Sequence, residues 1–308
     1  MSAWRPLSSE ELSTPPLETF GGPAFEVLRA APAGSPPPSA LVFASPHSGD
    51  LYPEDMVAAV RLPIETLRAS EDSFVDRIIG GAPGLGASVV RARLARAYVD
   101  LNREPWELDP AMFDEDLPDY AQGRSARVAA GLGTIPRLAG EGRPIYGRKL
   151  SFDEAKARVE LAHRPYHDAL DRQLAAARAA HGAAILIDWH SMPAAAARGQ
   201  RTRSGGACDI VLGDRFGAAC SPKLTALVER ELEALGYSVA RNAPYAGGYT
   251  TEHYGRPAKR THALQIEINR ALYMDEATRA PTDGLAKLTA DAEALTRALV
   301  RMDLGTLR

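Results

Sequence analysis

The run ILIDWHSMP, residues 185–193, constrains the fold most strongly, because it begins as a buried strand and ends in polar side chains. Short, continuously apolar runs of this kind are typical of strands that are covered on both faces. They alternate along the chain with segments of helical periodicity, the clearest of which are 151–182, 221–236 and 283–302. The alternation predicts an α/β fold with a mixed, largely parallel central sheet that is flanked by helices on both faces.

Local signals refine this outline. Ser151 and Glu154 form a capping box at the start of the clearest helix, and Pro165 predicts a kink inside it. Residues 62–81 are interpreted as a further helix that ends in two glycines. Residues 107–150 are loop-rich, and because a connection of this length is often functional, we expect a lid there.

Composition bounds the domain organisation and the class of protein. We expect residues 1–39 to form an N-terminal extension with a Pro-rich connection, and residues 40–308 to form a single α/β domain. The formal net charge of −3 predicts no nucleic-acid partner, and no apolar run is long enough to predict a membrane span. The two cysteines do not suggest a disulfide framework, and no secretory signal is visible, so a cytoplasmic protein is expected. The oligomeric state stays open.

Two histidines follow apolar strands at the point where each strand ends. His47 comes after the run at 40–45, His190 comes after the run at 185–189, and a serine follows each of them. Ligands of open α/β sheets bind beyond the carboxyl ends of the strands, so equivalent histidines there suggest a zinc site. The alternative is that each imidazole only forms hydrogen bonds with its own loop.

A zinc site needs a third protein ligand, and a carboxylate is an ordinary one. Asp50 lies three residues after His47, and Asp188 lies two residues before His190 on the same face of the strand. Glu71 and Asp72 open the segment EDSFVDRII and offer two further acids. Spacing alone does not choose among these four acids. Asp188 could also orient an imidazole without touching the metal.

The segment HALQIEIN, residues 262–269, contains a candidate general base. Its alternation places Glu267 on the polar face of a strand, with isoleucines on the other face. A buried glutamate needs a partner, and a metal-activated water molecule is one. A salt bridge from an arginine such as Arg270 is the structural alternative.

Two other segments contain candidate substrate contacts. Arg103, in YVDLNRE, has a planar guanidinium that matches a substrate carboxylate, although a surface ion pair is the commoner role for an arginine. The loop at 242–255, NAPYAGGYTTEHYG, combines glycines, tyrosines and His253, which indicates a close approach to another group.

The chain resembles the N-formylglutamate amidohydrolases from about residue 40 to residue 277. The motifs that carry this resemblance occur in the order SPHSG, VDLNRE, HRPYHDAL, LIDWHSMP, DIVLG, YAGGYTTEHYG and LQIEINRALYM. The resemblance implies a zinc-dependent amidohydrolase related to carboxypeptidase-like peptidases and aspartoacylases. It also implies the phosphorylase/hydrolase-like sheet architecture of such zinc peptidases.

The resemblance assigns roles by position. His47 and His190 match the zinc histidines, and Glu267 matches the general base. The acidic ligand corresponds to the pair at 71–72. Asp72 is preferred because the family usually has an aspartate there, while Glu71 remains a rival.

The resemblance also implies the substrate. Asn102 and Arg103 are similar to the pair with which aspartoacylases hold a carboxylate, and we add Tyr249, His253 and Arg270 as candidate substrate contacts. The expected substrate is a small acidic N-acyl amino acid, most simply N-formyl-L-glutamate, which would be cleaved to formate and L-glutamate. The alternatives are a related hydrolase that acts on another acylated amino acid or a peptide, and a zinc-binding protein without catalysis.

Overall fold

The computed structural model describes residues 22–121, 123–139, 142–198 and 207–307. The chain divides into two compact units that interleave along the sequence. The first unit comprises 1–26, 49–71 and 92–172, and the second comprises 27–48, 72–91 and 173–308. Most of the expected N-terminal extension lies outside the described residues. The expectation of one domain from residue 40 onward stays a prediction.

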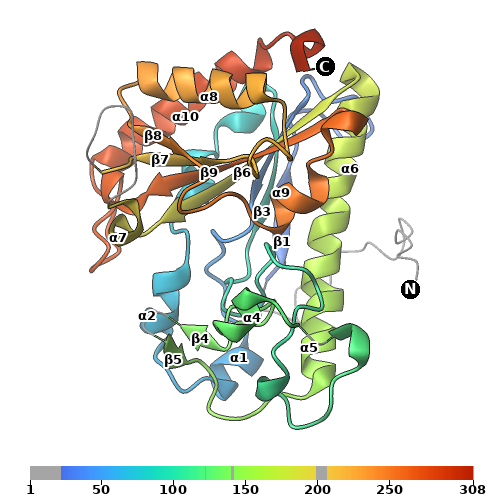
Figure 1. Ribbon diagram of the computed structural model, residues 1–308, viewed down its shortest axis with the longest axis vertical. Coiled ribbons are helices and arrows are strands. Elements are labelled where there is room, and N and C mark those ends of the chain that lie inside the picture. Colours follow the sequence, from blue (N-terminus) through green and yellow to red (C-terminus); the bar gives the residue numbers. More distant parts are fainter. Residues whose placement is uncertain (1–21, 122, 140–141, 199–206, 308) are drawn as a thin grey trace. The chain divides into compact units, whose positions relative to one another are not determined.

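A seven-stranded sheet is the framework for the candidate site (Figure 1). Its strands are β1 (Phe25–Leu28), β2 (Leu41–Ser45), β3 (Ser88–Ala92), β6 (Ala184–Met192), β7 (Ile210–Gly213), β8 (Val239–Arg241) and β9 (Thr261–Asn269), in the order β1-β3-β2-β6-β9-β7-β8. Strand β2 pairs in parallel with β3 and β6, β6 pairs in parallel with β9, and β7 with β8. Within this sheet, β7 pairs antiparallel with β9. The predicted mixed, largely parallel sheet is therefore confirmed.

Helices of varied length connect the strands. They are α1 (Glu54–Ala59), α2 (Ile64–Leu67), α3 (Val75–Ile78), α4 (Ala126–Ala129), α5 (Phe152–Arg158), α6 (Arg164–His181), α7 (Ala194–Ala197), α8 (Pro222–Ala234), α9 (Tyr249–Tyr254) and α10 (Gly284–Val300). None of the helices in the described part of the chain is both long and apolar enough to cross a bilayer.

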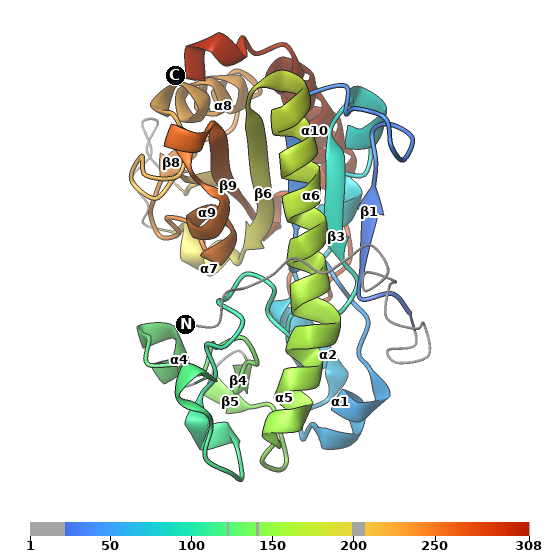
Figure 2. The same cartoon turned by 90° about the vertical axis from the view of Figure 1, so that its right-hand side faces the viewer.

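Alternation along the central strands separates the main core from the polar side chains. One face of β6 and β9 contributes alternate apolar residues, such as Ile187 and Ile266, to a core that α3, α8 and α10 complete. The opposite face contacts α9, which lies against β9 and β6 (Figure 2). There the backbone N–H of Gly248, just before α9, donates to Gln265. Helices therefore cover both faces, as the apolar strands predicted.

The helix predicted over 62–81 is wrong in its middle. Helix α2 ends at Leu67, a 3-10 turn spans Arg68–Ser70, and α3 begins only at Val75. The backbone N–H of Asp72 donates to the carbonyl of His47 at 2.9 Å, so it is not part of a helical ladder. This tertiary hydrogen bond outweighs the helical propensity of the segment and brings Asp72 to the end of β2.

The clearest predicted helix is present, with an interruption before Pro165. The capping box of Ser151 and Glu154 is confirmed at the start of α5. One π-helical turn, Val159–His163, separates α5 from α6. Because Pro165 has no N–H to donate, the regular hydrogen-bond ladder cannot continue through it, and the π-helical turn lies directly before α6, which contains this proline. The kink expected at Pro165 stays a prediction.

The segment 107–150 contains only short elements among its described residues, as expected. They include α4 and a two-stranded ribbon of β4 (Leu138–Ala139) and β5 (Arg143–Pro144). Side chains of the segment, with Phe113 and Ile135 among them, form a small hydrophobic core together with Ala155 of α5. A role as a lid stays a prediction.

We predict that Ser151→Ala lowers the free energy of unfolding by about 1 kcal/mol, because it removes the side chain that accepts from the N–H of Glu154. Urea denaturation measures the change. The matched control is Ser35→Ala at an exposed serine. Equal midpoints for both variants would mean that the capping box does not stabilise this helix.

Candidate metal centre and active site

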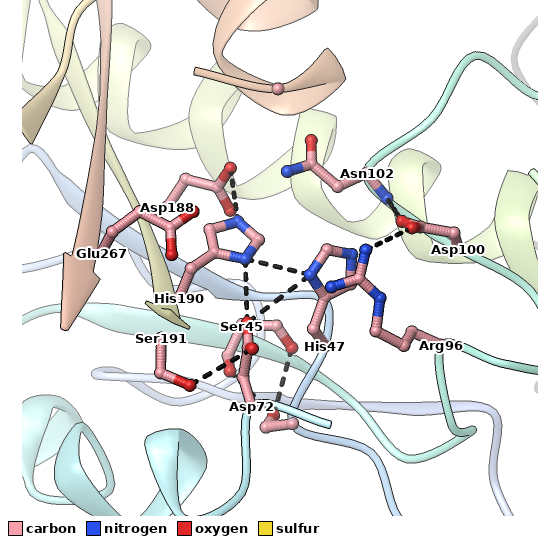
Figure 3. A network of polar contacts seen from close by, with 12 residues as sticks. Ser45, His47, Asp72, Arg96, Asp100, Asn102, Asp188, His190, Ser191 and Glu267 are labelled. Carbon is pink, nitrogen blue, oxygen red and sulfur yellow. Dashed lines mark hydrogen bonds and ion pairs between the residues drawn. The ribbon is translucent and has the colours of Figure 1, made fainter. Parts of the chain in front are cut away.

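Three buried side chains converge within the second unit: His47, Asp72 and His190. Each of the three residues offers one atom that can bind a metal ion, and these three atoms all lie within 4.8 Å of one another. Nδ1 of His190 is 3.1 Å from Oδ2 of Asp72 and 3.1 Å from Nδ1 of His47, which itself is 3.5 Å from Oδ2 of Asp72 (Figure 3). Two imidazole nitrogens and one carboxylate oxygen that face a common point can hold a metal ion.

The sheet explains why these residues meet. Strands β2 and β6 pair in parallel, so their carboxyl ends lie at one edge of the sheet. His47 lies two residues beyond β2, and His190 lies near the end of β6. The run 185–193 thus ends in polar residues because the end of β6 contributes His190 to the three converging side chains. Ile187 and Trp189 point into the core, while Asp188 and His190 alternate with them.

Asp188 orients one of the imidazoles. Its Oδ2 lies 3.1 Å from Nε2 of His190, on the opposite side of the ring from Nδ1. Burial lowers the pKa of His190, but the charge and hydrogen bond of Asp188, the hydrogen bond of Asp72 and the charge of Glu267 together outweigh burial and raise the pKa well above its usual value. Because a histidine ligand must be a neutral imidazole, a bound metal ion would replace the proton on Nδ1, while the carboxylate at Nε2 would keep the other ring proton there. The contact agrees with the orienting role considered for Asp188.

Asp72 is held in its anionic form and in one orientation. Burial raises its pKa, but the hydrogen bonds and charges of His190 and His47 together outweigh burial and hold the pKa well below its usual value. Its Oδ1 accepts from Ser191 Oγ at 3.2 Å and from Arg270 Nη2 at 3.1 Å. These two donors engage Oδ1, while Oδ2 faces the histidines. An anionic carboxylate is the form that binds a metal ion.

Arg270 is a buried part of this group. Besides Asp72, its guanidinium contacts Ser191, with Nε donating to Oγ at 3.1 Å. The importance of Ser191 was not foreseen from the sequence, although its place directly after His190 was a signal. A substrate contact for Arg270 stays a prediction beside these observed contacts.

The rival acids have other partners. Glu71 is buried, and it accepts from the hydroxyl of Tyr52 at 2.8 Å and from Arg68 Nε at 3.3 Å. Asp50 is exposed and lies 3.9 Å from Arg93. Of the acids at 71–72, Asp72 is the one in the converging group.

Glu267 lies next to the converging group on the neighbouring strand. It is the register partner of His190 in the parallel pair of β6 and β9, and Figure 3 shows it beside Asp188 and His190. The predicted alternation is confirmed, because Ile266 and Ile268 belong to the core on the other face. Gln265 Nε2 donates to Oε1 of Glu267 at 2.8 Å. Gln265 shares the polar face of Glu267, and that pattern could have identified it from the sequence.

The loop 242–255 makes the close approach that its glycines indicated. A Cβ at Gly213, the last residue of β7, would lie 2.8 Å from backbone atoms of Ala246 and Gly247. Helix α9 then carries Tyr249 and His253, whose rings stack with centroids 5.0 Å apart. Both residues therefore belong to one short helix that follows the tight contact.

The first unit holds the two candidates from VDLNRE. Asn102 is buried, and its backbone N–H donates to Asp100 Oδ1 at 2.9 Å. The Nη1 of Arg103 donates to the carbonyl of Asn102 at 2.8 Å, and its Nε donates to the carbonyl of Leu132 at 2.9 Å. Part of the Arg103 guanidinium therefore fixes its own loop.

Two histidines of the motif HRPYHDAL hold the same loop from the π-helical turn and α6. Nε2 of His163 lies 2.9 Å from the carbonyl of Arg103, and Nε2 of His167 lies 2.8 Å from the carbonyl of Leu101. The imidazoles contact the backbone on both sides of Asn102. The sequence marked His167 as part of a motif but did not reveal this contact.

Fold and site together define a class, that of α/β enzymes with a donor triad at one edge of the sheet and a glutamate on the adjacent strand. A family model goes further: the one described as N-formylglutamate amidohydrolase matches residues 39–274. The chain belongs to the N-formylglutamate amidohydrolase family, and it is an amidohydrolase. The resemblance inferred from the ordered motifs is thereby confirmed.

Curated relatives and solved structures agree with this family. The N-formylglutamate deformylase of Pseudomonas putida is 34% identical to this chain, and the match covers 77% of this chain and 82% of the relative. The N-formylglutamate deformylase of Pseudomonas aeruginosa is also 34% identical, and that match covers 87% of this chain and 92% of the relative. The crystal structure of N-formylglutamate amidohydrolase from Ralstonia eutropha JMP134 is 38% identical, covers 92% of this chain and 98% of its own, and has a TM-score of 0.81. A gene product of Agrobacterium tumefaciens is 18% identical, covers 96% of this chain and 98% of its own, and shares the fold with a TM-score of 0.62.

We predict that Asp72→Asn weakens the binding of Zn²⁺ to the chelator-treated protein by about 100-fold or more. Changes to groups that merely orient metal ligands already cost about 10- to 100-fold. Competition with a chromophoric chelator measures the affinity. Glu71→Gln is the matched control, since this neighbouring acid is equally buried and should leave affinity unchanged. A larger loss in the control would transfer the ligand role to Glu71.

Proposed function

We propose that this protein hydrolyses N-formyl-L-glutamate to formate and L-glutamate with the help of a zinc ion. The observation that carries the proposal is the convergence of His47, Asp72 and His190 beside Glu267 in a chain of this family. The name of the two Pseudomonas relatives supports the choice of substrate, because each match extends over most of both chains.

The donor set suits zinc. Two imidazole nitrogens and one carboxylate oxygen are typical of catalytic zinc sites with three protein ligands. The low pKa of Asp72 keeps this donor anionic, and the contact of Asp188 with Nε2 of His190 leaves Nδ1 facing the other two donors. When bound, zinc would supply a positive charge that polarises the scissile carbonyl and acidifies a water molecule.

Glu267 is the proposed general base. It would take a proton from the attacking water and donate it to the amide nitrogen as the C–N bond breaks. The products are then formate and an amine, so the proton taken from water leaves with the amino acid. Its place across from His190, on the neighbouring strand, supports this role because the base and this member of the donor triad share one face of the sheet.

Five residues are proposed to contact the acidic substrate: Asn102, Arg103, Tyr249, His253 and Arg270. Arg103 would use guanidinium N–H groups beyond those that donate to backbone carbonyls. Arg270 already holds Asp72, so we propose that it orients this ligand in addition to any contact with substrate.

The proposal is tested by metal removal and a product assay. The chelator-treated protein should release no formate from N-formyl-L-glutamate, and equimolar Zn²⁺ should restore the release. N-acetyl-L-glutamate serves as the matched substrate for acyl specificity. Zinc binding without turnover of any N-formyl or N-acetyl amino acid would instead indicate a zinc-binding protein without catalysis.

We predict that Glu267→Gln lowers kcat by about 10²- to 10⁴-fold, the usual contribution of a general base. The amide is nearly isosteric, so bound zinc and the melting temperature should stay close to those of the wild type. Steady-state kinetics and metal analysis measure both effects. Glu229→Gln is the control, because Glu229 is a similarly buried glutamate that pairs with Arg241. Normal turnover in Glu267→Gln would remove Glu267 from the mechanism, and loss of zinc would make it a ligand.

We predict that Arg103→Lys raises KM for N-formyl-L-glutamate by roughly 10-fold, because a hydrogen bond to a charged group is worth about 1.5–3 kcal/mol. Lysine keeps the charge but loses the planar fork. N-formyl-L-alanine, which lacks the side-chain carboxylate, should be affected less. Arg137→Lys, at an arginine that pairs with Asp109, is the control. An equal effect on both substrates would show that Arg103 does not bind the side-chain carboxylate.

A further inference from the structure

Gln265 connects the proposed base to a backbone group of the loop before α9. It lies two residues before Glu267 on β9, so both side chains leave the same face of the strand. Its Nε2 donates to Oε1 of Glu267 at 2.8 Å, and its own Oε1 accepts from the N–H of Gly248 at 2.8 Å. Both hydrogen bonds are buried. The amide of Gln265 therefore links the N–H of Gly248 to the carboxylate of Glu267, all within the second unit.

The direction of this chain of hydrogen bonds is dictated by chemistry. The backbone N–H of Gly248 can only donate, so it must meet the oxygen of the Gln265 amide. The NH₂ group of the same amide then has to face Glu267, whose Oε1 must act as an acceptor. Rotation of the amide by half a turn would set two donors against each other at one end. The orientation of Gln265 thus follows from its partners.

The anchor at Gly248 is itself firmly held. The hydroxyl of Thr251 donates to the Gly248 carbonyl at 2.9 Å, and the N–H of Arg215 donates to the Ala246 carbonyl at 2.8 Å. Gly247, with a φ of 122°, leaves no room for a side chain, since a Cβ there would lie 2.4 Å from Thr251 Oγ1. These contacts hold the backbone N–H of Gly248 in a fixed position from which it donates to Gln265.

We propose that Gln265 is a positioning residue for Glu267, and that it links the base to α9. The hydrogen bond restricts rotation of the Glu267 carboxylate, which favours one geometry for proton transfer. Because Gly248 directly precedes Tyr249, the same amide couples the base to the helix proposed to contact substrate. The inference rests on the proposed function, in which Glu267 is the general base.

Two variants separate the positioning of the base from the anchoring of the loop. Gln265→Met keeps the length of the side chain but removes both hydrogen bonds. It should lower kcat by roughly 10- to 100-fold, because small misplacements of a reacting group cost up to about 10²-fold. Thr251→Val removes the hydroxyl that holds the Gly248 carbonyl but keeps both hydrogen bonds of Gln265, so it should lower kcat less than Gln265→Met does. A wild-type kcat in Gln265→Met would overturn the proposal.

A double-mutant comparison excludes a merely structural role. In a Glu267→Gln background the base is already lost, so Gln265→Met should lower kcat no further. A loss that multiplies with that of Glu267→Gln would show that Gln265 acts independently of the base, and it would overturn the proposal. Zinc content and melting temperature are measured for every variant, to confirm that the metal and the fold are retained.

The proposed function can fail separately from this inference. Wild-type protein that releases no formate from N-formyl-L-glutamate would refute the function. The link itself is then judged by hydrogen exchange of the Gly248 amide. Gln265→Met should accelerate this exchange by roughly 10-fold, since the amide loses its acceptor. Unchanged exchange would show that the link does not hold Gly248, and it would overturn the inference whatever the substrate.

Discussion

The electrostatic contact of Asp72 with His47 and His190 is the constraint on which the rest of the site depends. A buried carboxylate is costly unless cations or donors surround it. Asp72 meets this condition with two imidazole nitrogens close to Oδ2, and with Arg270 and Ser191 at Oδ1. The break in the helix before α3 accompanies this contact, because in a continuous helix the N–H of Asp72 would not donate to the carbonyl of His47 beyond β2.

Strands β6 and β9 contribute both to the hydrophobic core and to the candidate active site. Successive side chains point to opposite faces, so β9 buries Ile266 and Ile268 in the main core and presents Gln265 and Glu267 on the other face. Parallel pairing of β6 with β9 then aligns Glu267 with His190. A shift of the register by one residue would send the base into the apolar core, so the packing of the isoleucines also protects the position of the base.

Much of the fold was predictable, because local patterns are enough to specify strands and long helices. The apolar runs, the capping box at Ser151 and the alternation around Glu267 are local patterns, and the structure contains each of them. The helix predicted over 62–81 was wrong in its middle because the backbone conformation there depends on a hydrogen bond from Asp72 to the carbonyl of His47, which is distant in sequence. The π-helical turn before Pro165 was not predicted, since a proline in the sequence indicates a kink and not the hydrogen-bond pattern of the preceding turn.

The sequence by itself determined the family, the α/β class and the residue types available for chemistry, because motifs and periodicity are properties of neighbours along the chain. Only the tertiary structure decided which acid joins the two histidines, since Glu71 and Asp72 are adjacent in sequence and differ in their partners. It also decided that Arg270 holds Asp72 and that Gln265 connects Glu267 to Gly248. These contacts join residues on different elements, and their geometry follows from how the strands and loops pack rather than from any local pattern.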